Sequence, residues 1–175
     1  MGGEATGGTA GGPGAMGSGG SPASNSSSTW AAWPMPNSAP DVSAGAPNPQ
    51  SYTVNADGTV TDNVTRLMWQ QGVPATAYTW SDAIAYCPSL TLGGYTDWRL
   101  PSVIELVSIL NFGQTGYLID TTAFSVTPQP GGTYWWSATP VAGMPGNAFD
   151  VDFPGGLGGP GYFPTSTMLN VRCVR

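Results

Sequence analysis

The chain contains no lysine and no histidine among its 175 residues. Its basic side chains are four arginines, which stand against ten carboxylates and leave a net charge of -6. Binding a polyanion requires clustered cationic side chains, so we expect neither nucleic acid nor heparin-like partners. Without histidine, the chain cannot use an imidazole as a catalytic base or build a zinc site from cysteine and histidine.

Long apolar runs are also missing, and no stretch approaches the roughly 18 apolar residues of a membrane-spanning helix. We therefore expect no membrane-spanning segment. The sequence has no glycine-rich run followed by lysine and no Gly-Xaa-Ser-Xaa-Gly motif, which argues against phosphate-loop and hydrolase chemistry. We expect a non-enzymatic protein without a cofactor.

Two cysteines, Cys87 and Cys173, lie far apart in the sequence. In a cytosolic protein they would be unrelated buried thiols, whereas in an exported protein they would pair. Charged residues make up only 8% of the chain. Small polar residues, glycine and proline replace them, which favours export and an extracellular or cell-surface location.

Residues 1–50 are expected to form a low-complexity N-terminal arm ahead of a folded domain at 51–175. Glycine and serine dominate residues 1–29, and such a composition predicts a flexible linker or a segment that orders only against a partner. Residues 30–50 combine Trp30 and Trp33 with five prolines, which predicts extended, polyproline-like chain. The two tryptophans either pack the arm against its own domain or anchor it to another subunit.

The domain is predicted to be α+β, with two short helices and antiparallel strands. An Asp-Gly pair at Asp57 and Gly58, between two β-prone runs, predicts a hairpin. Capping residues predict helices that begin after Thr79 and after Ser102. The other expected elements are strands at 67–70, 134–139, 148–153 and 170–175, a helix end near Leu110, and a Gly/Pro loop at 154–164.

Several ordered blocks of residues 52–175 resemble a known family. These blocks are Asp57-Gly58-Thr59-Val60-Thr61-Asp62-Asn63, Leu67-Met68-Trp69, Thr79-Trp80 through Ala83 to Cys87, Gly94-Tyr95-Xaa-Asp97-Trp98-Arg99-Leu100-Pro101, Glu105-Leu106, Trp136-Ser137 and Val171-Arg172-Cys173-Val174-Arg175. They resemble the Lcl C-terminal domain family, named for a bacterial collagen-like surface adhesin. The chain departs from the family pattern at Arg66, where that family commonly has glycine.

The resemblance implies a C-type-lectin-like fold in which Cys87, on the first helix, pairs with Cys173, on the last strand. Family members are generally exported modules on adhesins, lipoproteins and surface arrays. Some bind carbohydrate, including sulfated glycans, but the few arginines of this chain do not support binding to sulfate. The Glu-Pro-Asn and Gln-Pro-Asp tripeptides of calcium-dependent sugar-binding lectins do not occur.

Candidate site residues each have a structural alternative. Asp57 and Asp62 could form a weak cation site, but a hairpin turn is the simpler interpretation. Asp150 and Asp152 lie on the same, polar face of an alternating strand and are either solvated or part of a ligand site. Since Trp135 and Trp136 are neighbours in a strand, one should be more exposed than the other.

We interpret the chain as an exported surface binding or adhesion module that presents loops 113–133 and 140–165. Trp136, Asp150, Asp152 and Tyr162 are its candidate ligand contacts, and Arg99 is expected to form a structural ion pair with Asp97 or Glu105. The alternative is a structural subunit of an extracellular fibre or surface array, with Trp30 and Trp33 in subunit contacts. Partners would be copies of the chain, another surface protein or carbohydrate.

Overall fold

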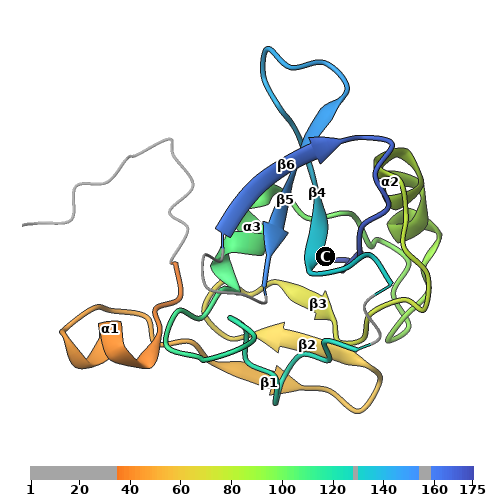
Figure 1. The fold of residues 1–175 in the computed structure, drawn as a ribbon. Helices are drawn as coiled ribbons and strands as arrows, with labels where there is room; N and C mark the ends of the chain where they lie inside the picture. The colour runs from red at the N-terminus through yellow and green to blue at the C-terminus, as the bar shows by residue number, and fades with distance from the viewer. Residues whose placement is uncertain (1–34, 128–129, 154–158) are drawn as a thin grey trace, which may run out of the picture. The chain divides into compact units, whose positions relative to one another are not determined.

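The computed structural model describes residues 35–127, 130–153 and 159–175, and these form an α+β domain with two antiparallel three-stranded sheets (Figure 1). The elements are, in chain order, helix α1 (Ala39–Ser43), strands β1 (Tyr52–Val54), β2 (Thr59–Asp62) and β3 (Met68–Gln70), helices α2 (Trp80–Ser89) and α3 (Val103–Ser108), and strands β4 (Tyr134–Pro140), β5 (Asn147–Asp152) and β6 (Gly159–Pro164). One sheet has the order β1-β2-β3 and the other β4-β5-β6. Trp30 and Trp33 lie outside the described residues.

The first sheet begins with the predicted hairpin, which pairs Tyr52 with Asp62 and Val54 with Val60. Gly58 has a φ of 82°, the left-handed conformation that the turn requires of a glycine. A second tight connection leads into β3 and holds Arg66 at a φ of 67°. Only glycine adopts this conformation without strain, which explains why glycine suits this position better than arginine.

The second sheet contains a strand that we did not predict. Residues 159–164, expected as part of a Gly/Pro loop, form β6 and pair in antiparallel register with β5 from Asp152↔Gly159 to Asn147↔Pro164. The loop prediction was wrong for these residues. Their glycines and prolines indicated a loop, but β6 is an edge strand, where prolines are tolerated. An edge strand is paired on one side only, so Pro160 and Pro164 can occupy positions whose missing N–H groups cost no ladder hydrogen bond.

Both predicted helix starts are confirmed. The Thr79 side chain accepts a hydrogen bond from the Asp82 backbone N–H at the start of α2, and Ser102 and Glu105 form a reciprocal capping box at the start of α3. Ala83 and Cys87 are buried on the inner face of α2, but Ile84, expected on the same face, is 38% exposed. Only a narrow stripe of the short helix α2 therefore faces the core.

The C-terminal segment, residues 169–175, joins the two sheets. It exchanges hydrogen bonds with β3 through Met68 and Arg175, and with β4 through Trp136, Tyr134 and Asn170. Its Cys173 forms the predicted disulfide with Cys87 of α2. Residues 170–175, predicted as a regular strand, instead form isolated β-bridges, one to Trp69 of β3 and one to Trp135 of β4. Figure 1 marks the C-terminus at this place.

Both faces of the β4-β5-β6 sheet are covered by a hydrophobic cluster. Trp135 packs in the cluster that includes α3, and Trp136 packs in the cluster that includes Cys87 and Cys173. Both indoles are fully buried. The prediction that one of the two would be more exposed than the other was wrong, because alternation along a strand exposes a residue only where one face of the sheet meets water.

Residues 35–50, predicted as extended chain within the arm, instead fold against the domain. A bridge between Asn37 and Pro49 closes a loop that contains helix α1. The Gln50 side chain donates a 2.6 Å hydrogen bond from Nε2 to the carbonyl of Leu110. The boundary of the folded part therefore lies before residue 50, and Pro40 contributes to starting α1 because its φ suits the first turn of a helix.

We expect replacement of both cysteines by alanine to lower the free energy of unfolding by about 4 kcal/mol. The disulfide spans a sequence separation of 86 residues, so its removal frees a large loop in the unfolded chain. Denaturant unfolding of the C87A/C173A chain and of the reduced wild-type chain measures the loss. Equal unfolding midpoints in oxidised, reduced and substituted protein would contradict this prediction.

Candidate functional site

Asp150 is the most unusual of the predicted site residues. It lies in the central strand β5, where it pairs with Trp136 of β4 on one side and with Gly161 of β6 on the other. Its side chain is fully buried, and neither carboxylate oxygen has a hydrogen-bond partner among the described residues. The expectation that this face of the strand is solvated was therefore wrong for Asp150.

Two aromatic rings explain this burial. Tyr134 of β4 and Phe163 of β6 lie on the same sheet face as Asp150, on either side of it, and their ring centroids are 4.9 Å apart. The rings therefore meet over the middle of β5 and cover the carboxylate. A Cβ atom on Gly161 would lie 3.2 Å from Asp150 Oδ1, so this position in β6 is tight for any other residue.

The electrostatic consequence is a carboxylic acid that titrates near neutral pH. Burial, with a smaller contribution from the charge of Asp152, raises the pKa of Asp150 to about 6. Burial also raises the pKa of Asp152, whose Oδ1 is buried without a partner. Both carboxylic acids therefore hold a proton more tightly in the folded protein than in an unfolded chain.

The four predicted ligand contacts do not form one surface site. Trp136 and Asp150 are fully buried and cannot touch a ligand without rearrangement of the sheet. Tyr162 is 53% exposed, but it alternates with Gly161 and Phe163 and so lies on the opposite face of β6. Of the set, Asp152 alone shares the face of Asp150 and remains partly accessible.

The other acidic pair, Asp57 and Asp62, is used within turns. Asp57 Oδ1 accepts hydrogen bonds from the backbone N–H and the hydroxyl of Thr59. Asp62 Oδ1 accepts from the backbone N–H groups of Val64 and Thr65. These contacts support the turn interpretation, and the described residues contain no cluster of three or more acidic, histidine or cysteine side chains that could hold a metal ion.

Three of the four arginines have structural partners. Arg99 makes a bidentate ion pair with Glu105, which is one of its two predicted partners. Arg175 pairs with Asp97. Arg172 is fully buried and donates to the carbonyls of Gln70, Gln71 and Ser125. These arginines are committed to holding the domain together rather than to binding an anion.

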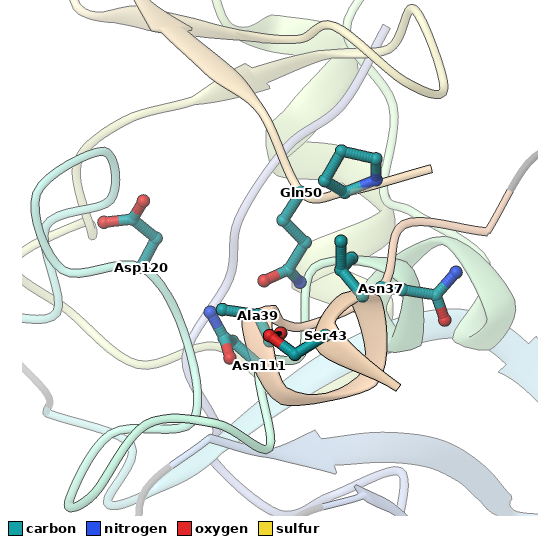
Figure 2. A pocket seen from close by; sticks show the side chains of 8 residues that line it. Asn37, Ala39, Ser43, Gln50, Asn111 and Asp120 are labelled. Carbon is teal, nitrogen blue, oxygen red and sulfur yellow. Dashed lines mark hydrogen bonds between the residues drawn. The ribbon is translucent and has the colours of Figure 1, made fainter. Parts of the chain in front are cut away.

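A pocket of about 300 Å³ lies between the α1 segment and the loop that follows α3 (Figure 2). Its lining residues come from both segments and are mostly polar or small: Asn37, Ala39, Val42, Ser43, Pro49, Gln50, Asn111 and Asp120. In Figure 2 the side chain of Gln50 extends toward Asn111 and Ala39, while Asp120 lies to one side. The pocket is thus formed by two segments whose lining residues are 61 to 83 positions apart in the sequence.

Local hydrogen bonds hold the polar groups of this pocket in defined orientations. The bond from Gln50 Nε2 to the Leu110 carbonyl leaves Gln50 Oε1 as a buried acceptor without a partner among the described residues. Asn111 Oδ1 accepts from the Gly113 backbone, which leaves its Nδ2 amide to face the pocket. Asp120 Oδ1 accepts from the Thr122 backbone at 2.9 Å and from its hydroxyl at 2.6 Å.

Comparison with known proteins adds a family assignment. The Lcl C-terminal domain matches residues 58–175, about two thirds of the chain. The chain belongs to this family. The membership indicates a surface-associated domain, and no helix among the described residues is long and apolar enough to cross a bilayer. No curated protein gives a significant match.

The pocket combines the Lcl C-terminal domain with residues that precede it. Asn111 and Asp120 lie inside the matched range, whereas α1 and Gln50 lie before residue 58. Sequence reasoning missed the pocket because it assigned residues 30–50 to an extended arm. The one usable signal was the Ser38–Pro40 sequence followed by Asp41, which is typical of a helix start.

We expect the stability of the protein to rise as the pH falls from 7 to 5. The pKa of Asp150 is about 6 in the fold and about 3.9 in an unfolded chain. The destabilisation by the buried charge is largest above pH 6, and protonation between pH 7 and pH 5 relieves about 1 kcal/mol of it, because relief is complete only below the unfolded pKa. Asp152 acts in the same direction, and the chain has no histidine to titrate in this window.

Urea unfolding at pH 5, 6 and 7 measures this dependence. The Asp150→Asn variant removes the charge at nearly constant shape, so its stability at pH 7 should exceed that of the wild type and change little with pH. Asp82→Asn, at an exposed position in the first turn of α2, keeps a side-chain oxygen that can accept from the Thr79 hydroxyl; it is the charge-removal control and should keep the wild-type slope with pH. A wild-type protein that loses stability between pH 7 and pH 5 would overturn the assignment.

Proposed function

We propose that this protein is an exported, non-enzymatic binding or adhesion module of the cell surface, built on a C-type-lectin-like domain. Membership of the Lcl C-terminal domain family supports the surface location. A cysteine on α2 pairs with a cysteine near the C-terminus, and the C-terminal segment is hydrogen-bonded to β3 in the first sheet of the domain. Both features support the lectin-like fold. Both cysteines are in the disulfide, which supports a role without thiol chemistry.

The observation that carries this proposal is the pocket between the α1 segment and residues 111–120. It gathers amide, hydroxyl and carboxylate groups beside the apolar side chains of Ala39, Val42 and Pro49, and a small-ligand site likewise combines apolar surface with a few polar groups. Gln50 Oε1 in particular is shielded from solvent and has no partner among the described residues, so a movement of the Gln50 side chain into the pocket would let a ligand donor satisfy it. The partner is accordingly a molecule that presents hydrogen-bonding groups, such as surface carbohydrate.

We expect the full chain, displayed at high density on beads, to be retained on a panel of immobilised surface glycans and matrix proteins. The Ser43→Trp variant places an indole at the exposed end of α1, where it fills the pocket, and should reduce retention at least tenfold. Thr53→Trp, at an exposed position of β1, is the matched control and should bind like the wild type. Retention of all three proteins on no member of the panel contradicts an adhesive role.

The second proposed function is that of a structural subunit in an extracellular fibre or array, in which Trp30 and Trp33 contact a neighbouring copy. Large aromatic residues contribute much of the energy of interfaces. Because residues 35–50 pack on the domain, the informative deletion removes only residues 1–34. We expect this deletion to leave thermal unfolding unchanged and to reduce self-association, measured by light scattering, and identical assembly of both chains would exclude the role of the arm.

A further inference from the structure

We infer that the pocket formed by Gln50, Asn111 and Asp120 binds a neutral, hydroxyl-rich ligand about the size of one sugar ring. The inference deepens the proposed function and rests on it. It concerns a site that the Lcl C-terminal domain does not form alone, because one of its walls is the segment of residues 37–50.

The polar groups of the pocket include an acceptor and a donor, so they fit a ligand that both donates and accepts hydrogen bonds. Gln50 Oε1 is an acceptor, and its orientation is set because Nε2 is bonded to the Leu110 carbonyl. Asn111 Nδ2 is a donor, and its orientation is set because Oδ1 is bonded to the Gly113 backbone. A hydroxyl group donates and accepts at once, so neighbouring hydroxyls on one ring can satisfy both amides.

The charge of the pocket excludes anions. Among the described residues of the lining, Asp120 is the only charged one, and its carboxylate is held by hydrogen bonds from Thr122. A sulfate or carboxylate on the ligand would face this negative charge without a cation in the lining to offset it. The net charge of the whole chain, -6, also disfavours an anionic ligand.

An ammonium ligand fits less well than a polyol. Its positive charge would suit Asp120, but an ammonium group only donates hydrogen bonds. It would therefore leave the Asn111 Nδ2 group facing a ligand that cannot accept from it. Satisfying both amides of the pocket is what distinguishes a neutral hydroxylated ligand from an amine.

The size of the pocket sets the size of the ligand. Its volume of about 300 Å³ lies at the lower end of the range for small-molecule sites, roughly 300 to 1,000 Å³. Val42, Pro49 and Ala39 add apolar surface against which the carbon face of a ring can pack. A single ring with few heavy atoms is expected to bind weakly, with a Kd of about 1 mM, so that useful affinity comes from many copies at a surface.

The test uses the full chain and defined probes. Ligand-observed NMR and titration with glucose, galactose, mannose and N-acetylglucosamine should detect binding of at least one of these neutral sugars. Sulfated disaccharides from heparin and methylammonium serve as the anionic and cationic probes and should bind at least tenfold more weakly. Sulfated or ammonium probes that bind as well as the neutral sugars would overturn the inference.

The deciding variant is Asn111→Asp. It keeps the Oδ1 acceptor that holds Gly113 and replaces only the Nδ2 donor, so the fold is preserved while the ligand loses a donor and meets a second charge. We expect at least a tenfold weaker affinity for the neutral sugar. Asn147→Asp makes the same change at the start of β5, outside the lining residues, and should leave binding unchanged.

The outcome separates this inference from the proposed function. If the beads are retained on glycans or matrix proteins but no neutral sugar binds, or Asn111→Asp binds like the wild type, the ligand class or the site is wrong while the adhesive function stands. If neutral sugars bind with the expected variant pattern but the beads are not retained, the site is correct and the adhesive function is wrong.

Discussion

The C-terminal segment is the element on which the rest of the domain depends. Residues 169–175 are hydrogen-bonded to β3 on one side and to β4 on the other, so neither sheet is complete without them. The same short segment contributes the buried Arg172 and the disulfide cysteine Cys173. Because the contacts with β3 and α2 join residues more than 80 positions apart, the two sheets and α2 can reach their final arrangement only when the end of the chain is in place.

Two buried charged groups are stabilised unequally in this domain. Arg172 is fully buried, yet it donates to three backbone carbonyls and lies over the ring of Phe124 at 5.0 Å. Burial lowers its pKa only to about 9, so it stays protonated at neutral pH. Asp150 has no comparable partner, and its raised pKa is the consequence. Hydrogen-bond partners rather than the sign of the charge make the difference, because the buried carboxylates of Asp62 and Glu105 also have partners.

The pocket follows from the way residues 35–50 pack. Helix α1 is too short to be stable alone, so it depends on its contacts with the domain, including Gln50 on the carbonyl of Leu110. That packing leaves polar side chains from both partners facing one another across a gap (Figure 2). The domain thus uses the residues ahead of the family region as one wall of its proposed ligand site.

The sequence by itself determined the features that depend on near neighbours in the chain. The Asp57-Gly58 turn and the caps at Thr79 and Ser102 follow from hydrogen bonds and backbone preferences within a few residues, and each is present in the structure. The blocks that resemble the family also placed Cys87 and Cys173 correctly, because both positions belong to the pattern of the fold.

Only the tertiary structure decided which faces meet water. Alternation along β5 predicted a polar face for Asp150, but Tyr134 and Phe163 come from other strands to cover it. Residues 159–164 contain two prolines that disfavour a strand, and they form β6 because β5 pairs with them. The pocket exists because two distant segments pack together. Burial is a sum of long-range contacts, and neither periodicity nor propensity along a single chain contains those contacts.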